Sequence, residues 1–226
     1  MPIKLLSPGG GSVILNASST GSNFTHTFPA ETGTVITSNT NSGINASALT
    51  TGRAPSSAMP AGSILQVVHT QLTTSFSGTS TQTGSGYYID VTGLSATITP
   101  TSSTSKILIL TNMYIGSSAA GNSGYQQSFR IKRNGTRVIL GAGEGGRPTS
   151  TGRINMYQLS TYDMQMFSGV HYDSPASTSS LTYQIELGGY SGSPIVYVNR
   201  SETWQVLAND YDTTPVSTLT LMEVAQ

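Results

Sequence analysis

The sequence predicts an all-β protein whose main domain consists of two antiparallel sheets packed as a sandwich. The 226 residues include 34 Ser and 32 Thr, which suit sheets and turns, while the usual helix formers are sparse. From residue 61 onward, strand-like runs recur at regular spacing with turn residues between them, as in sandwiches and barrels. One of these runs, residues 107–110, is apolar on both faces, which is typical of a central strand between two layers.

The charge balance excludes several functional classes. The chain has 10 Lys+Arg and 10 Asp+Glu, so its net charge is zero, and it contains no Cys. A protein that binds nucleic acid by neutralising phosphates needs a cationic excess, and a small disulfide-stapled secreted domain needs cysteines. No run of residues resembles a secretory signal or is long enough to span a bilayer. We therefore expect synthesis in a cytoplasm, no membrane insertion, no nucleic-acid partner and no cofactor.

The first 37 residues contain short β-like runs, such as residues 12–15, that are too small to enclose a core. Isolated two-stranded pieces are marginally stable in water, so these runs need apolar partners from elsewhere. If three chains wrap around one axis, each copy can bury its apolar side chains against the others. We therefore predict a trimerisation and attachment segment over residues 1–37, with Val13, Leu15, Phe24, Phe28 and Val35 as trimer contacts.

Residues 38–60 form a predicted linker, because they are rich in Ser, Thr and Asn and carry glycines and prolines that favour turns. The C-terminal sandwich domain then covers residues 61–226. Its predicted strands are residues 64–72, 87–91, 96–99, 106–115, 128–133, 136–140, 154–159, 164–171, 181–187, 195–199, 203–207 and 218–224.

The clearest local prediction is a β-hairpin over residues 128–140. Asn134-Gly135 suits the positive φ angles of a two-residue type I′ turn. The resulting register places Ile131 opposite Val138 and Phe129 opposite Leu140 on one side of the ribbon.

Four segments of the predicted sandwich resemble the C-terminal domains of tail-fibre and other virion surface proteins of tailed, often marine, bacteriophages. They are residues 91–110, 172–176, 198–202 and 217–225, and residues 44–55 resemble the repeat that precedes distal domains in such fibres. The resemblance implies a homotrimeric, elongated virion protein with a jelly-roll-like distal β-sandwich. Only 60 residues precede the sandwich, which is a short shaft, so tail and capsid locations both remain open.

Motifs that suggest chemistry have simpler explanations. Residues 141–146 match the G-x-G-x-x-G string, but the following Arg147-Pro148 cannot continue a helix that would hold a pyrophosphate. The histidines lack metal-ligand spacing within one chain, although His26 on a threefold axis would allow an ion site, and residues 209–212 lack the rest of a calcium loop.

A glycosidase needs two carboxylates across a cleft. Candidates are Glu144, Asp163, Asp173, Glu186, Glu202, Asp210, Asp212 and Glu223. We predict no catalytic residues and no metal site.

The hairpin concentrates four basic residues, Arg130, Lys132, Arg133 and Arg137. One interpretation is a patch that contacts anionic groups of a host surface, because arginine binds phosphate and carboxylate through paired hydrogen bonds. The other is an edge ribbon kept soluble and unpaired by its charge. Tyrosines in predicted loops are additional candidate receptor contacts: Tyr125, Tyr190 and Tyr211.

Together these features predict a non-enzymatic structural protein on the exterior of a virion. The leading interpretation is a tail fibre or surface fibre whose distal sandwich contacts the host and whose N-terminal segment binds other virion proteins. A capsid head fibre or decoration (cement) protein is the first alternative. A lectin-like module that binds a host surface glycan through Tyr and Asn/Asp loops is the second.

Overall fold

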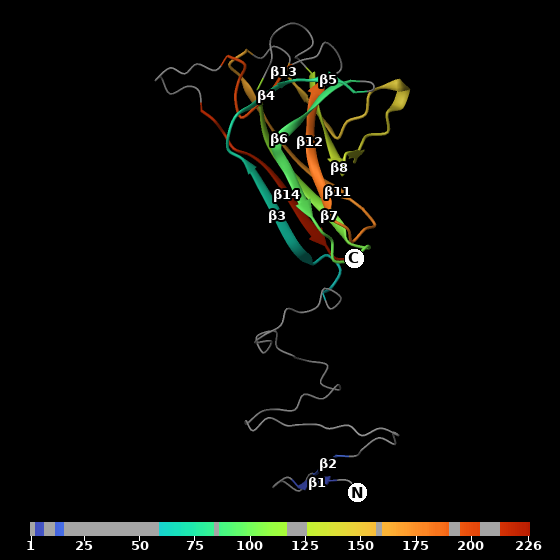
Figure 1. The fold of residues 1–226 in the computed structure, drawn as a ribbon. Helices are drawn as coiled ribbons and strands as arrows, with labels where there is room; N and C mark the ends of the chain where they lie inside the picture. The colour runs from blue at the N-terminus through green and yellow to red at the C-terminus, as the bar shows by residue number, and fades with distance from the viewer. Residues whose placement is uncertain are drawn as a thin grey trace. The chain divides into compact units, whose positions relative to one another are not determined.

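The structure is a computed structural model of residues 1–226, and it describes residues 3–6, 12–15, 59–83, 86–116, 126–156, 160–189, 195–203 and 213–226. The chain divides into two units, Met1–Thr51 and Gly52–Gln226 (Figure 1). The predicted boundary at residue 37 lies outside the described residues, and of the predicted linker only residues 59 and 60 are described.

The described part of the first unit is an antiparallel pair of strands. β1 (Ile3–Leu6) pairs with β2 (Ser12–Leu15), with Ile3 opposite Leu15 and Leu6 opposite Ser12. The run at residues 12–15 is thus a strand, as predicted, whereas its partner at residues 3–6 was not expected. Val13 and Leu15 lie on β2, while Phe24, Phe28 and Val35 lie outside the described residues. Their role as trimer contacts stays a prediction.

The second unit is a sandwich of two antiparallel sheets, six strands each, as the sequence predicts. The first sheet, here called sheet I, has the order β3-β14-β7-β13-β4, with β11 also pairing with β7. The second, sheet II, has the order β10-β8-β12-β6-β5, with β9 also pairing with β8. The strands are β3 (Ile64–Leu72), β4 (Phe76–Thr79), β5 (Thr81–Gln82), β6 (Tyr87–Ile98), β7 (Lys106–Gly116), β8 (Gln126–Arg133), β9 (Thr136–Val138), β10 (Gly152–Asn155), β11 (Met164–Asp173), β12 (Leu181–Gly189), β13 (Ile195–Val198) and β14 (Ser217–Val224).

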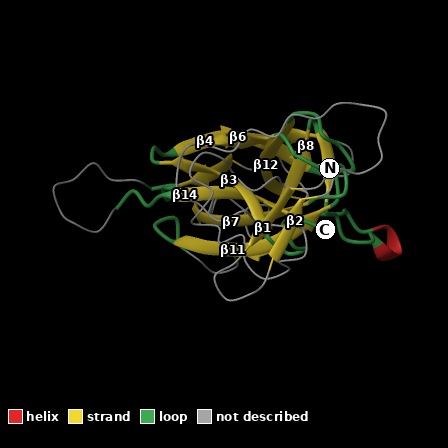
Figure 2. Cartoon of the chain, turned by 90° about the horizontal axis from the view of Figure 1, so that it is seen from below, coloured by secondary structure: helices red, strands yellow, loops and turns green. Residues whose placement is uncertain are grey.

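The eight principal strands follow the jelly-roll order. β3, β14, β7 and β11 are neighbours in one layer, and β6, β12, β8 and β10 are neighbours in the other. Apart from the β8 to β10 connection, each successive principal strand crosses to the opposite layer, which produces the two Greek keys of a jelly roll. Figure 2 shows both layers. The jelly-roll-like fold is therefore confirmed.

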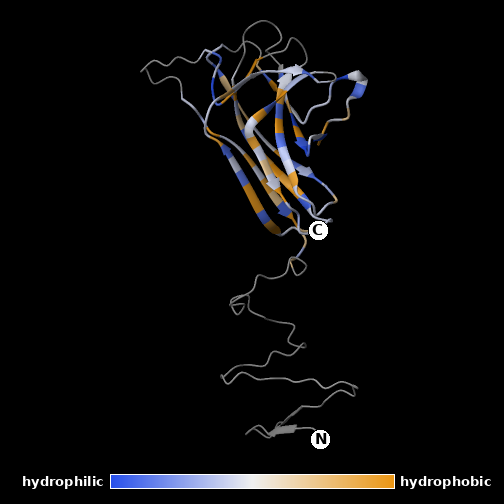
Figure 3. Cartoon of the chain, in the orientation of Figure 1, coloured by the Kyte–Doolittle hydropathy of each residue, from blue (hydrophilic) through white to orange (hydrophobic). Residues whose placement is uncertain are grey.

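The core lies between the layers and is lined by inward-facing residues of most strands, and Figure 3 colours the hydrophobic residues of the sheets orange. On β7, Ile107 and Ile109 are fully buried against the opposite sheet. Phe129 of β8 packs against Phe167 of β11, with 4.5 Å between ring centroids. This period-two alternation explains why strand positions were predictable from the sequence.

Two details of the predicted strands are wrong. Residues 87–91 and 96–99 belong to one strand, β6, which bends at Gly93 with φ of +94° while its pairing with β12 shifts register. In addition, β7 is central, between β14 and β11, but only one of its faces is buried. Leu108 and Leu110 lie on the outer face and are half-buried, and no other sheet among the described residues packs over them.

The predicted hairpin is formed by β8 and β9. Asn134 and Gly135 have φ angles of +48° and +81°, as a type I′ turn requires, and Ile131 lies opposite Val138. The predicted pairing of Phe129 with Leu140 is wrong. β9 ends at Val138, and Phe129 instead lies opposite Gly152 of β10.

A buried asparagine after β13 ties three parts of sheet I together. The Asn199 side-chain amide donates hydrogen bonds to the carbonyl oxygens of Leu72 (2.7 Å) and Thr74 (3.1 Å). Its carbonyl oxygen accepts a hydrogen bond from Ser217 Oγ (2.6 Å), which in turn accepts one from the backbone N–H of Tyr114 (3.0 Å). Asn199 has a φ of +58°, a left-handed conformation that asparagine tolerates.

The first and last residues of the sandwich are hydrogen-bonded to each other. The N–H of Gly62 donates to the carbonyl oxygen of Ala225 (2.9 Å), and the N–H of Ala225 donates to that of Ser63 (2.9 Å). The first residues of the domain and its C-terminus are therefore held side by side.

Candidate functional site

The four hairpin cations gather around β8, but β8 is not an edge. It pairs with β12 on one side and with β10 and β9 on the other, so β8 is an interior strand, whereas β9 pairs, among the described strands, only with β8 and lies at the edge of sheet II. Alternation along β8 places Phe129 and Ile131 in the core and directs Arg130 and Lys132 to the outer face of sheet II.

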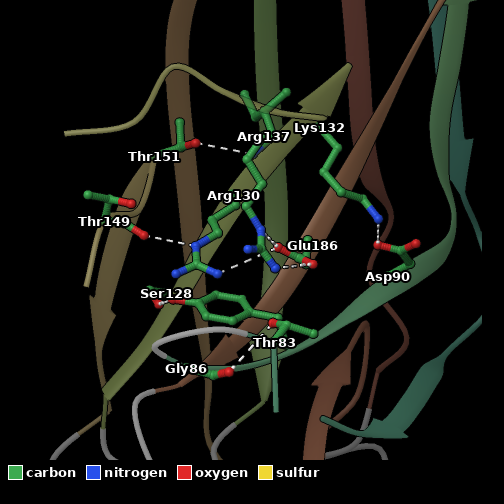
Figure 4. A network of polar contacts seen from close by, with 12 residues as sticks. Thr83, Gly86, Asp90, Ser128, Arg130, Lys132, Arg137, Thr149, Thr151 and Glu186 are labelled. Atoms are coloured by element: carbon green, nitrogen blue, oxygen red, sulfur yellow. Dashed lines mark hydrogen bonds and ion pairs between the residues drawn. The ribbon is translucent and has the colours of Figure 1, made fainter. Parts of the chain in front are cut away.

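Arg130 is buried although it points away from the core, because Tyr88, Glu186 and Thr149 lie around its guanidinium (Figure 4). Its Nε donates a hydrogen bond to the carbonyl oxygen of Thr149 (2.8 Å). Its guanidinium lies over the Tyr88 ring, 3.6 Å from the centroid, which gives a cation–π contact. Burial lowers the pKa of Arg130. Gly188 lies opposite Tyr88 on β12, and a side chain there would clash with the backbone of Tyr87 and Tyr88.

Glu186 of β12 forms ion pairs with both Arg130 and Arg137. Its Oε2 lies 3.9 Å from Arg130 Nη1, while Arg137 donates from Nε to Oε2 (3.0 Å) and from Nη2 to Oε1 (3.3 Å). The hydrogen bond with Glu186 raises the pKa of Arg137. The three residues form a triad in which one buried carboxylate faces two guanidiniums, and this arrangement is visible in Figure 4.

The remaining two cations also have acidic partners. Lys132 forms an ion pair with Asp90 of β6. Arg133 donates a hydrogen bond from Nη1 to Oδ2 of Asp173 on β11 (2.7 Å), and the two side chains form an ion pair. Burial opposes the charge on Arg133, but the hydrogen bond and charge of Asp173 outweigh this effect and raise its pKa.

Asp173 accepts a second hydrogen bond, from the Tyr183 hydroxyl (2.7 Å), and links the two sheets through β11, β8 and β12. Burial, followed by the hydrogen bond with Asp173, raises the pKa of Tyr183. The hydroxyl therefore stays protonated and acts as a donor in this contact.

This arrangement pairs each hairpin cation with an acidic residue, although Arg130 Nη1 is buried without a hydrogen bond to any described residue. Each has a carboxylate partner within the chain, so an external anion would compete with Glu186, Asp90 or Asp173 for them. Their role as receptor contacts stays a prediction, and Tyr125, Tyr190 and Tyr211 lie outside the described residues. Sequence reasoning did not identify these acidic partners, because each comes from a strand at least 40 residues from its cation in sequence.

Other residues with suggestive chemistry have structural roles where they are described. His69 shares a hydrogen bond with Thr220 (2.7 Å), and His171 packs against Phe129 in a position where burial lowers its pKa. The glycine-rich stretch at residues 141–146 contains a short 3₁₀ turn, Glu144–Gly146, followed by extended Arg147, so it lacks the helix of a dinucleotide site. His26 and residues 209–212 lie outside the described residues.

Glu223 of β14 is a fully buried carboxylate that closes one end of the sandwich. It accepts hydrogen bonds from Gln66 Nε2 (2.6 Å) and from the backbone N–H (2.7 Å) and hydroxyl (2.8 Å) of Thr101. Burial alone would raise its pKa, but these bonds favour the carboxylate and lower the pKa below the usual glutamate value.

Because the pKa of Glu223 is lower in the folded state, its stabilising contribution is present above the unfolded pKa of about 4.3 and is lost as the pH falls through the folded pKa. We expect Glu223→Gln to lower the free energy of unfolding by about 2 kcal/mol at neutral pH. The difference from the wild type should begin to shrink below about pH 4.3, where the unfolded carboxylate takes up a proton, and should disappear once the pH falls below the folded pKa of Glu223. Urea unfolding at a series of pH values measures this, and a difference that stays constant down to pH 3 contradicts it.

Within the described ranges, no group of three or more His, Cys, Asp and Glu residues is placed to hold a metal ion. None of the described residues forms a helix long and apolar enough to cross a membrane.

Comparison with known proteins gives only distant likenesses. No family model and no curated protein matches the chain. Among solved structures, infectious bursal disease virus Gt strain matches at 14% identity with a TM-score of 0.37, covering 78% of this chain and 42% of that one. The VP2 subviral particle of infectious bursal disease virus matches at 14% identity with a TM-score of 0.33, covering 71% of this chain and 37% of that one. The T=1 particles derived from the virus match at 15% identity with a TM-score of 0.33, covering 73% of this chain and 37% of that one. The chain thus spans less than half of each structure, and at these TM-scores the likeness carries no conclusion about function.

Proposed function

We propose that this chain is a non-enzymatic structural protein of a virus particle and that it serves as a tail fibre or surface fibre. The observation that carries the proposal is the position of the phage-like segments in the fold. Residues 91–110 span most of β6 and the first five residues of β7, and residues 217–225 include all of β14. Residues 172–176 and 198–202 contain Asp173 and Asn199, which tie strands together through buried hydrogen bonds. The resemblance therefore involves the residues that stabilise the jelly roll.

The carboxylates support the non-enzymatic part of the proposal. Asp173, Glu186 and Glu223 each accept hydrogen bonds within the sandwich. The donors are Tyr183 for Asp173, Arg137 for Glu186 and Thr101 for Glu223. A glycosidase acid needs a raised pKa and a cleft for the sugar, whereas the pKa of Glu223 is lowered. These groups are suited to stability rather than to proton transfer.

In this proposal the N-terminal unit joins three copies and attaches them to other virion proteins, while the sandwich faces the host surface. The marginal stability of an isolated hairpin such as β1–β2 supports the first part. A capsid decoration role uses the same architecture at another place on the particle.

Antibodies against the sandwich, imaged on purified virions by electron microscopy, test the proposal. Label on the tail or on fibres supports it. Label over the capsid lattice shifts the assignment to decoration, and absence of the protein from washed particles overturns a virion role.

A further inference from the structure

The outer face of sheet I exposes aliphatic and aromatic side chains that cover four strands. Pairing between strands brings these side chains into two neighbouring rows across β11, β7, β14 and β3. The first row is Tyr172, Leu108, Met222 and Val67, and the second is Val170, Leu110, Thr220 and His69. We call these eight residues the sheet I face.

The two sides of this face are open to solvent. Val67 is 54% exposed on β3, and Val170 and Tyr172 are 64% and 51% exposed on β11. Leu108, Leu110 and Met222 lie half-buried between them. A monomer rarely exposes a broad apolar surface of this kind, and such patches usually mark an interface.

The sheet I face carries no Asp, Glu, Lys or Arg, unlike the outer face of sheet II. On sheet II, the outward positions of three neighbouring strands hold Arg130, Glu186 and Asp90, and ion pairs satisfy them within the chain. At the margin of the sheet I face, Lys106 Nζ lies 6.0 Å from the centre of the Tyr172 ring. An uncharged face can meet a copy of itself without repulsion, and the chain as a whole has no net charge.

The outer surface of the four strands, of which the sheet I face is one part, also has the size needed to bind a second copy. Strands β3, β14, β7 and β11 have 9, 8, 11 and 10 residues. At about 4.8 Å between strands and about 3.3 Å per residue, four such strands cover roughly 600 Å². Two copies would then bury about 1,200 Å² together, which is the lower limit of a standard stable interface.

We propose that a second copy of this chain packs against the sheet I face. Sheets that pack face to face lie about 10 Å apart with interleaved side chains, as the two layers of this sandwich do. The second copy then supplies a layer above Leu108 and Leu110, over which the described residues place no second sheet. This contact is independent of the virion role, because it rests on the composition and exposure of one face.

The absence of cysteine from the chain allows a local test on the full-length protein. Val170→Cys places one thiol on the sheet I face, and Thr182→Cys places one on the exposed outer face of sheet II as the matched control. We expect a maleimide reagent to label Cys at position 170 at least about tenfold more slowly than at position 182, at a protein concentration of about 100 µM. This readout concerns the face itself, so contacts between N-terminal segments do not produce it.

A second substitution identifies what covers the face. Val67→Lys puts a charge on the opposite side of the sheet I face, and burying it against an apolar partner is unfavourable. Added to Val170→Cys, it should restore labelling to the rate of the Thr182→Cys protein, and Thr97→Lys on sheet II should not. Circular dichroism confirms that each variant is folded.

Equal labelling at positions 170 and 182 over the whole concentration range overturns the proposal. Slow labelling that neither dilution to about 0.1 µM nor Val67→Lys relieves also overturns it, because a segment of the same chain then covers the face. Both results would leave the location of the protein on a particle unaffected, so this test and the antibody experiment can fail separately.

Discussion

Replacing Glu186 with alanine is expected to lower the free energy of unfolding by about 3 to 5 kcal/mol, because it leaves the buried Arg130 without its carboxylate. Side-chain exposure is 2% for Arg130 and 6% for Glu186, so water cannot readily replace the lost partner. Arg137 loses both of its hydrogen bonds to Glu186 as well. Chemical denaturation monitored by circular dichroism measures the effect.

Two further variants separate the buried charge from general damage to the sheet. Lys132→Met removes the partner of the half-exposed Asp90, and we expect a loss of less than about 1 kcal/mol. The double substitution Arg130→Met with Glu186→Leu removes the buried pair together and should recover most of the stability lost in Glu186→Ala. If the double variant is as unstable as Glu186→Ala, the buried charge is not the cause.

Asn199→Ala is expected to cost about 4 kcal/mol, because it leaves the buried Leu72 carbonyl oxygen and Ser217 hydroxyl, and the part-buried Thr74 carbonyl oxygen, without their partner. Alanine must also adopt the left-handed φ of +58° that asparagine tolerates, which adds a backbone penalty of about 1 kcal/mol. Urea unfolding of the variant, compared with the wild type, gives the total.

Asn199→Gly isolates the backbone part of this effect. Glycine loses the same hydrogen bonds but adopts a positive φ without strain, so it should be about 1 kcal/mol more stable than Asn199→Ala. If the alanine variant is as stable as the glycine variant or more stable, the left-handed backbone carries no penalty here. A loss below about 1 kcal/mol in both would contradict the role of the buried amide.

The sequence was sufficient to predict most of the fold because the alternation of apolar residues reports the buried face directly. The expected strand at residues 64–72 agrees with β3 at both ends, and the asparagine-glycine turn identified the β8–β9 hairpin. β4 and β5 were not predicted, since their sequences, FSGT and TQ, are short and mostly polar. They form strands only because β13 and β6 supply partners.

The candidate site was less predictable, because its partners are brought together by pairing between distant strands. The cations of β8 were visible as a cluster in sequence, but Glu186 and Asp173 meet them only through the register of β12 and β11. The sheet I face was hidden for another reason. Residues 107–110 are apolar on both sides, and a sequence pattern cannot tell whether the layer over Leu108 and Leu110 belongs to the same chain or to another.

The bonds from Gly62 to Ala225 and from Ala225 to Ser63 have a practical consequence for protein engineering. Since the ends of the sandwich are adjacent, a few glycines would suffice to join them, and a new start could be opened in the surface turn at Asn134-Gly135. A circular permutant made in this way would keep every layer of the jelly roll while moving both free termini away from the point where the chain now enters.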